Sequence, residues 1–318
     1  MAPASRMHAH MGDPMLTLHG VLRHSAFASL LAAAPLGSAM AQGAFRPVDW
    51  KPVDQVLGRS GAPQPGDVYK FGFPRSDLRV SVGQVVVKPA LALGSWLAFK
   101  QTGDTEALVM GDLVLLQSEV SGVIRILQEG GIEETALHNH LLNDSPHVMY
   151  LHIAGRGAPV KLATTLRAAL GVTHTPLAPP PAAAAPSSLD LDTAQVAQVL
   201  GVHGKVNGGV YQVAVPRADG VTMQGVEVPP AMGTATALNF QPTGRGNAAV
   251  TGDFVMIAGE VTPVLRALRA NGIEVTALHS HMLEESPHLF FMHFWGTGDA
   301  VTLARGLRAG LDQMNVKR

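Results

Sequence analysis

Cysteine is absent from this 318-residue sequence. Its absence excludes disulfide bonds, thiolate metal sites, a cysteine nucleophile and a lipid-modified N-terminal cysteine. An excess of charge of one sign is lacking too, since the formal net charge is −1, so nothing attracts the whole chain to nucleic acid or an anionic membrane. Only 15% of residues are charged and 47% are apolar, which is typical of a globular protein rather than a disordered one.

Several common signatures are also missing. The sequence contains no Ser-His-Asp order, no P-loop and no dinucleotide fingerprint. The apolar run at 26–37 is too short for a comfortable membrane span. Arg23 and His24 precede this run and Ala39-Met40-Ala41 follows it, which together predict a signal peptide at 1–41 with cleavage before Gln42. We therefore expect export to the periplasm or beyond; a mitochondrial-type presequence and a buried helix are the alternatives.

The histidines of this sequence are arranged in an unusual, repeated pattern. Residues 136–152 read ALHNHLLNDSPHVMYLH, and residues 277–293 read ALHSHMLEESPHLFFMH. Between 136–155 and 277–296, ten of twenty positions are identical, and all four histidines are among them. The spacing of the histidines has been kept while the residues between them differ, which indicates a site.

The histidine motif belongs to a longer duplication. Val68-Tyr69 matches Val210-Tyr211, and Gly111-Asp112 matches Gly252-Asp253. We predict two tandem homologous domains, 48–171 and 190–316, joined by a Pro/Ala-rich linker at 172–189 that cannot bury a core. The repeat is far longer than the roughly 20–50 residues of a solenoid repeat, so the duplicated unit is a whole domain.

The second domain shows its expected elements most clearly. Helices are predicted at 193–200, 264–270 and 300–314, the second beginning at Thr262-Pro263. β-Branched and alternating residues predict strands at 209–215, 221–228, 235–241, 248–257, 274–282 and 288–295, with a hairpin turn at 283–287. Each domain is therefore predicted to be α+β, an antiparallel sheet with two or three helices.

The spacing within the first motif predicts a group of ligands. His138 and His140 are two apart, so they lie on one face of a strand and can bind one ion together. If the returning strand places His152 opposite His138, a third imidazole joins them. Ser145-Pro146 favours a turn, so we expect His147 to lie there and either complete the set or support it. The equivalents in the second domain are His279, His281, His293 and His288.

Neutral imidazole is a common ligand of zinc, copper, nickel and iron. The leading hypothesis is a soluble periplasmic protein that binds a divalent transition metal, zinc or copper, through the histidine hairpin of each domain. A second hypothesis is a metal-dependent enzyme, a hydrolase or a cupin-like oxygenase or isomerase, using the same histidines. A third is a cell-wall or ligand-binding module in which the histidines are structural. Expected partners are the metal ion and a small-molecule or cell-wall ligand, without nucleic acid or stable membrane insertion, and the two domains can pair as an intrachain pseudo-dimer.

Some carboxylates and arginines also recur in both domains. Glu119 and Glu260 stand ahead of matching helices, which indicates either helix-dipole complementation or a carboxylate serving the metal site as a support or general base. Glu133 and Glu274 directly precede the histidine strand and are further candidates for the base. Asp112 and Asp253 follow glycine and are predicted to be turn residues, and Arg75 and Arg217 are expected to form surface salt bridges.

The pattern ALHxHxLxxSPHxxxxH, together with VYxxxxPR, resembles the LppY/LpqO family of exported bacterial proteins, whose domain of unknown function often occurs twice. The resemblance covers about Val48 to Val316 and implies an exported two-domain protein, with little indication of activity. Named members are lipoproteins. This chain has no cysteine to acylate, so we expect a soluble form.

Overall fold

The computed structural model describes residues 45–178 and 189–317. The predicted signal peptide at 1–41 and most of the predicted linker lie outside the described residues.

The helices are α1 Lys51–Leu57, α2 Pro89–Ala92, α3 Val120–Glu129, α4 Pro159–Gly171, α5 Thr193–Leu200, the 3-10 helix η1 Pro230–Met232, α6 Ala258–Ala270 and α7 Ala300–Leu311. The strands of the first domain are β1 Ala62–Gln64, β2 Val68–Pro74, β3 Ser81–Val82, β4 Val85–Val86, β5 Gly94–Gln101, β6 Ala107–Leu116, β7 Glu133–His138, β8 Asp144–Ser145 and β9 Val148–Gly157. Those of the second are β10 Lys205–Asn207, β11 Val210–Pro216, β12 Thr222–Met223, β13 Val226–Glu227, β14 Ala235–Gly244, β15 Asn247–Met256, β16 Glu274–His279, β17 Glu285–Ser286 and β18 Phe290–Asp299.

Each domain is built on one six-stranded antiparallel sheet. The strand orders are β1-β2-β5-β6-β9-β7 and β10-β11-β14-β15-β18-β16, so the two sheets have the same topology. A small three-stranded sheet accompanies each, β4-β3-β8 in the first domain and β13-β12-β17 in the second. The predicted fold class, two tandem α+β domains, is confirmed.

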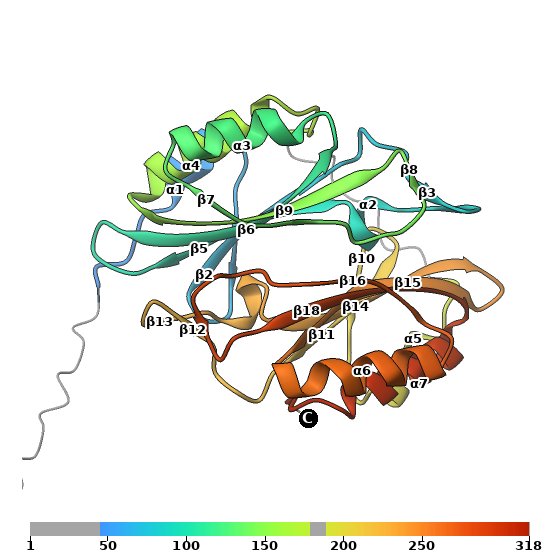
Figure 1. The fold of residues 1–318 in the computed structure, drawn as a ribbon. Helices are drawn as coiled ribbons and strands as arrows, with labels where there is room; N and C mark the ends of the chain where they lie inside the picture. Colours follow the sequence, from blue (N-terminus) through green and yellow to red (C-terminus); the bar gives the residue numbers. More distant parts are fainter. Residues whose placement is uncertain (1–44, 179–188, 318) are drawn as a thin grey trace, which may run out of the picture. The chain divides into compact units, whose positions relative to one another are not determined.

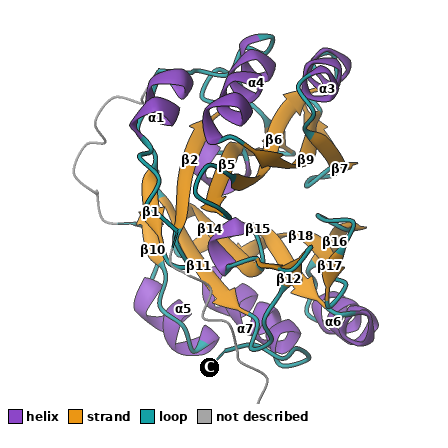
Figure 2. Ribbon diagram, turned by 90° about the vertical axis from the view of Figure 1, so that its left-hand side faces the viewer, coloured by secondary structure: helices purple, strands orange, loops and turns teal. Residues whose placement is uncertain are grey.

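The two large sheets face each other, and the helices cover their outer faces. Figure 1 shows α1, α3 and α4 over one sheet and α5, α6 and α7 over the other. Figure 2 shows the same layers from the side, with β6 and β9 above β15 and β18. Residues 45–318 form one compact unit. The two sheets are therefore parts of a single structural unit.

Both faces of the central strands are buried. Alternate residues of a strand project to opposite faces, and Val109 and Leu113 of β6 pack under the outer helices while Met110 and Val114 face the other domain. All but the last of the ten residues of β6 are buried. Continuous apolar runs of this kind explain why simple alternation is hard to see in the sequence.

Hydrogen bonds join the two inner faces in equivalent pairs. Thr135 Oγ1 donates to the carbonyl oxygen of His281, and Thr276 Oγ1 donates to that of His140, each over 2.6 Å. Two apolar clusters also join the domains, since each contains buried residues of both. The matching bonds in both directions indicate a two-fold relation between the domains.

Most predicted elements of the second domain are present, but several differ. The strand predicted at 274–282 ends at His279, and the predicted turn at 283–287 contains the short strand β17. Helix α5 has the predicted bounds and ends at Gly201 in the left-handed conformation. The single strand predicted at 221–228 is instead the pair β12 and β13, which turns back at Gln224-Gly225. Helix α6 begins at Ala258, not after Thr262, because the Glu260 carboxylate accepts a hydrogen bond from Ile257 N–H and caps the helix earlier.

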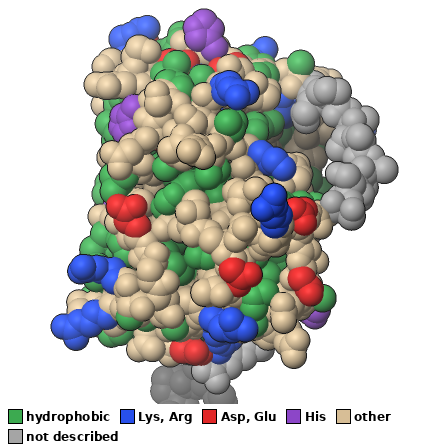
Figure 3. Space-filling model, turned by 90° about the vertical axis from the view of Figure 1, so that its right-hand side faces the viewer, with side chains coloured by type: hydrophobic (Ala, Val, Ile, Leu, Met, Phe, Trp, Pro, Cys, Tyr) green, Lys and Arg blue, Asp and Glu red, His purple; other side chains and the backbone are tan. Residues whose placement is uncertain are grey.

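The surface carries mixed charges. On the face shown in Figure 3, basic and acidic side chains are interspersed among hydrophobic and neutral ones. None of the helices among the described residues has the length and apolar character needed to cross a membrane.

Candidate metal centre

Asp112 and His152 lie side by side on the inner face of the first sheet. Asp112 is paired with His152 across β6 and β9, and with Trp96 across β5 and β6. The second sheet repeats the arrangement, with Asp253 paired with His293. Residues paired across a sheet project to the same face. The prediction that both aspartates are turn residues was therefore wrong, since each lies within a ten-residue buried strand.

The glycine before each aspartate allows a close approach of neighbouring strands. A Cβ atom added at Gly252 would lie 1.8 Å from the carbonyl oxygen of Ala237. One added at Gly111 would lie 2.7 Å from the carbonyl oxygen of Trp96. Any side chain at either position would push the adjacent strand away, so the repeated Gly-Asp pair is explained by packing.

Six histidines, three from each domain, meet between the sheets. The ring centroids of His138 and His279 are 3.7 Å apart. Those of His140 and His293 are also 3.7 Å apart, and those of His152 and His281 are 3.6 Å apart. Each of these three closest pairs joins one domain to the other. His152 thus stacks on His281 of the opposite hairpin, and His293 lies against His140 with the rings tilted by 30°.

Aromatic neighbours hold two of the rings from behind. The Tyr150 ring stacks on His140 at 3.3 Å between centroids, and Phe291 stacks on His281 at 3.4 Å in the second domain. Tyr150 is fully buried, and burial raises the pKa of its hydroxyl well above the ordinary value. These contacts fix the orientation of His140 and His281 toward the space between the sheets.

The register of the histidine strands differs from the prediction. His138 is paired with Tyr150, and His152 is paired with Ala136, so His152 lies two residues from the partner of His138. A displacement of two residues keeps the side chains on the same face. The rings of His138 and His152 therefore still lie 5.0 Å apart.

Burial keeps these imidazoles neutral. It lowers the pKa of His138, His140, His152, His279 and His281 well below the ordinary value, and neighbouring imidazoles lower it further. The carboxylates respond in the opposite direction: burial and then the charge of Asp253 raise the pKa of Asp112 to about 8, and burial raises that of Asp253 to about 6. Neutral imidazole is the form that binds metal ions.

Many polar atoms of the cluster are buried without a hydrogen-bond partner among the described residues. They are His138 Nδ1, His140 Nε2, His152 Nε2, His281 Nε2, both ring nitrogens of His279, Asp112 Oδ1 and Asp253 Oδ1. The nearest acid–imidazole approach is 3.2 Å, between Asp253 Oδ2 and His281 Nε2. An unsatisfied buried polar group costs about 1–3 kcal/mol. The concentration of such groups in one place indicates a binding site for an ion or a polar ligand.

Four groups of side chains have donor atoms within 4.8 Å of one another and could hold a metal ion. They are His138, His152, His279 and His281; His138, His140 and His293; Asp112, His140 and His152; and Asp253, His281 and His293. Two groups combine histidines of both domains, and the other two each combine an aspartate with two histidines of one domain. None of the four joins the three histidines of one hairpin, because the opposite domain or an aspartate supplies the remaining ligand.

A cleft of about 970 Å³ reaches this centre. Its lining includes both aspartates and four of the histidines, His140, His152, His281 and His293. The other lining residues come from both domains and are mainly Gly, Ala and Pro, with Lys70 and Trp96 at one side. Its walls therefore combine apolar surface with a few polar groups, as in sites for small molecules.

The remaining two motif histidines lie elsewhere. His147 Nδ1 is 2.9 Å from Asp144 Oδ1, and His288 Nδ1 is 2.9 Å from Glu285 Oε1. These side chains are 48% and 51% exposed, whereas the carboxylates they contact are fully buried. His147 lies between β8 and β9, as the turn predicted at Ser145-Pro146 suggested. Neither histidine belongs to the groups that could hold an ion.

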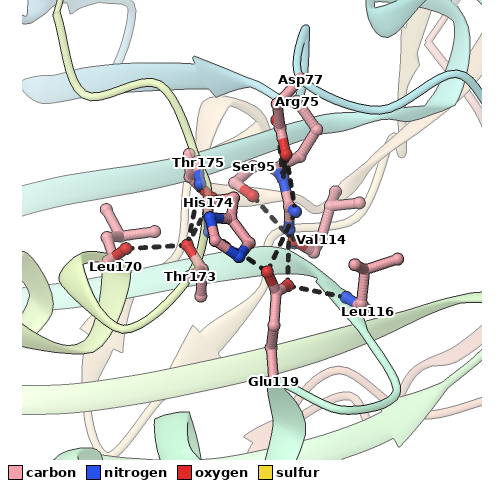
Figure 4. Close-up of polar contacts among 10 residues, drawn as sticks. All are labelled: Arg75, Asp77, Ser95, Val114, Leu116, Glu119, Leu170, Thr173, His174 and Thr175. Carbon is pink, nitrogen blue, oxygen red and sulfur yellow. Dashed lines mark hydrogen bonds and ion pairs between the residues drawn. The ribbon is translucent and has the colours of Figure 1, made fainter.

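The glutamates predicted as catalytic candidates have other positions. Figure 4 shows Glu119 accepting hydrogen bonds from Arg75 and from the backbone N–H groups of Leu116 and His174. Arg75 is fully buried, so the expected surface salt bridge is in fact a buried one, and it also contacts Asp77. The second domain repeats this ion pair with Arg217 and Glu260, 2.5 Å apart. These pairs tie the start of α3 and α6 to the end of β2 and β11.

Glu133 and Glu274 are exposed at the start of β7 and β16. None of the four glutamates lines the cleft that reaches the histidines, so the structure gives no support to a general base among them. Asp112 and Asp253 are the carboxylates that sequence reasoning missed. The signal available was a single acidic residue within an otherwise apolar run, repeated in both domains.

Comparison with known proteins gives a family but no activity. No curated protein matches the chain. A trimeric bacterial microcompartment shell protein PduB has 12% identity, a TM-score of 0.21, and coverage of 80% of this chain and 90% of its own. EtuB from Clostridium kluyveri has 10% identity, a TM-score of 0.19, and coverage of 80% and 91%. These scores are too low to support an argument.

The resemblance to the LppY/LpqO family stays a prediction. One family model matches residues 51–172 and again residues 194–313. The two matches cover most of the chain and both halves of the histidine cluster. The chain therefore belongs to the family described as Domain of Unknown Function (DUF1259), and it contains two copies of that domain.

Proposed function

We propose that this protein binds a divalent transition metal at a centre shared by its two domains. The ligands would be drawn, three or four at a time, from six histidines and two aspartates: His138, His140, His152, His279, His281, His293, Asp112 and Asp253. The observation that carries the proposal is the set of buried imidazole nitrogens without hydrogen-bond partners among the described residues. Coordination would satisfy these atoms, and burial already holds the imidazoles in the neutral form that coordination needs.

Nitrogen and oxygen donors without any thiolate suit zinc, copper(II), nickel and iron(II). We propose zinc or copper as the physiological ion, since both favour imidazole. Each domain also offers two histidines and one aspartate, a donor set that non-haem iron(II) proteins use. Iron(II) is therefore the ion against which zinc and copper should be compared.

A metal-dependent enzyme is the second candidate, and the cleft is the observation that favours it. Both aspartates and four of the six histidines line this cleft, so a small molecule can reach potential metal ligands. A closed structural site would have no such access. The bound ion would supply Lewis-acid or redox chemistry, and the chain would supply a mostly apolar cleft that positions the ligand.

The test compares two histidine pairs from the same motifs. The variant His138→Ala/His279→Ala removes the central pair, and His147→Ala/His288→Ala removes the exposed pair. Purified proteins are dialysed against zinc, copper(II) or, without oxygen, iron(II), and their metal content is measured by mass spectrometry. We expect the wild type and the exposed-pair variant to retain metal and the central-pair variant to lose it. A wild type that retains none of the three metals would sink the proposal.

We also propose that the protein acts outside the cytoplasm. This rests on residues 1–41, whose charged start, apolar run and Ala39-Met40-Ala41 end are typical of a signal peptide. N-terminal sequencing of the protein from its native host should find a chain beginning at Gln42. A mature chain that keeps residues 26–37 would contradict export by this route.

A further inference from the structure

The two sides of the cleft differ at positions that are equivalent in the two domains. Lys70 of β2 corresponds to Gln212 of β11, and Trp96 of β5 corresponds to Ala237 of β14. The register supports this equivalence, because Trp96 is paired with Asp112 and Ala237 with Asp253. The metal ligands are the same in both domains, so the two-fold relation breaks beside the centre rather than within it.

Lys70 and Gln212 make the same contact between domains. Lys70 Nζ donates to the carbonyl oxygen of Ala231 over 2.8 Å, and Gln212 Nε2 donates to that of Ala90 over 2.7 Å. Ala231 and Ala90 lie in the equivalent short helices η1 and α2. A neutral amide is therefore sufficient for this structural contact. The positive charge of Lys70 is additional to it.

The surroundings of Lys70 accommodate an ammonium group. Its Nζ lies 4.1 Å from the centroid of the Trp96 ring, a cation–π distance. The ring lies against Gly233, where a Cβ atom would come within 3.1 Å of it. The first domain has Ala92 at the position equivalent to Gly233. The two domains therefore differ at three neighbouring positions of the cleft. The first domain thus supplies the Trp96 ring, and the glycine of the second domain leaves space for it.

Lys70 is the only lysine or arginine that lines the cleft among the described residues, and within those residues it forms no ion pair. Burial is the largest influence on its pKa, which it lowers to about 8, so the amine is still mostly protonated at neutral pH. A cation on a mainly apolar wall, with donors to spare after its bond to Ala231, is suited to an anion.

We propose that the cleft binds a small organic carboxylate, with Lys70 holding its anionic group beside the shared metal centre. This inference rests on the proposed metal binding, because that binding would place an ion beside the ligand. The contact between Lys70 and the carboxylate itself needs no metal. The apolar remainder of the ligand would lie against partly exposed cleft-lining residues such as Ala231 and Ala237. Trp96 acts as a positioning residue, since its ring supports the ammonium group.

The experiment uses benzoate and benzamide, which have the same shape and differ in charge. Each is titrated calorimetrically into metal-loaded and metal-free full-length protein. The variant Lys70→Gln introduces the residue that the second domain has, and Lys70→Arg keeps the charge. Lys88→Gln is the matched control, because Lys88 Nζ also donates to a carbonyl oxygen of the other domain, that of Gly209 at 3.0 Å, but does not line the cleft.

We expect the wild type to bind benzoate more tightly than benzamide. Lys70→Gln should raise the Kd for benzoate about tenfold or more, since a hydrogen bond to a charged group is worth at least that much. Lys88→Gln should leave the Kd unchanged, and Lys70→Arg should retain most of the affinity. Metal content and melting temperature, measured on every variant, show whether the centre and the fold are intact.

Three results would overturn the inference: no benzoate binding by the wild type, equal binding of benzoate and benzamide, or an unchanged Kd in Lys70→Gln. Each can occur in a protein that holds its metal, in which case metal binding stands and the carboxylate site falls. If the wild type holds no metal, the titrations of the metal-free protein still decide whether Lys70 binds the anion.

Discussion

The inner and the exposed histidines of this protein share one motif and have different surroundings. His138, His140 and His152 meet their counterparts between the sheets, whereas His147 lies in a turn against Asp144. All four are kept in both copies, so retention in the duplicate does not distinguish a ligand from a residue that holds a turn. Burial separates the two groups: His152 is 3% exposed, and the His147 side chain is 48% exposed.

The largest effect should come from removing inner histidines that face each other across the domains. His140→Ala and His293→Ala should each weaken metal binding by about 100-fold or more, since loss of a partner outside the ligand set already costs about 10–100-fold. The ring centroids of the two residues are 3.7 Å apart, and both belong to one group of potential ligands. In a shared centre, the double variant should therefore lose less than the two single losses combined.

The control for this cycle pairs His140→Ala with His147→Ala, two histidines of the same hairpin. Their effects on the metal Kd, measured by competition with a chelator of known affinity, should be additive because the His147 ring contacts Asp144 in its own turn and belongs to no group of potential ligands among the described residues. Additive losses for His140 and His293 would contradict a shared centre. They would favour one independent site in each domain.

Sequence reasoning predicted the fold class and most members of the histidine cluster from local patterns. The α5 helix was predicted with both ends, because its apolar spacing and the glycine that ends it are local. His138 and His140 also lie close together as predicted, with rings 5.0 Å apart, although β7 ends at His138 and His140 lies just beyond the strand. Which histidine lies nearest was not predictable, because that depends on how the domains dock.

The missed features are those that need distant parts of the chain. The partner of His140 is His293, which follows from the facing of the two sheets and not from any hairpin register. Asp112 was read as a turn residue because glycine precedes it, although the glycine is required by the close approach of β5. Glu119 has no visible relation to Arg75 in the sequence, since 44 residues separate the members of their buried ion pair.

The pH dependence of stability should also separate inner from exposed histidines. In the metal-free protein the inner histidines stay neutral when folded, while unfolded histidine binds a proton below its ordinary pKa of 6.5. The unfolded state then holds more protons, so stability falls as the pH drops below about 6.5. Asp112 acts in the opposite sense: its pKa is raised from 3.8 to about 8, so the folded state holds the extra proton and stability falls as pH rises toward 8.

Five histidines with lowered pKa outweigh two carboxylates on the acid side. Between about pH 6.5 and 8 Asp112 dominates, and Lys70, whose pKa is lowered to about 8, opposes it only as the pH approaches 8. The melting temperature of chelator-treated protein should therefore peak near pH 6.5, with a steep fall toward acid and a shallow fall toward alkali. Asp112→Asn should flatten the alkaline side, and His147→Ala should not change the profile. A melting temperature that rises steadily from about pH 6.5 to 8 would show that Asp112 is ionised in the folded protein.

The smallest effect should come from the exposed pair. In His147→Ala/His288→Ala, each lost contact is a hydrogen bond from a half-exposed ring, worth about 1 kcal/mol or less. The carboxylates keep backbone partners, because Asp144 Oδ2 still accepts from Val148 N–H and Glu285 Oε1 from Leu289 N–H. Urea unfolding should therefore show a small loss of stability with unchanged metal content. Metal loss in this variant, with the fold intact by circular dichroism, would mean that the turn histidines are ligands and that burial is the wrong criterion for separating the two classes.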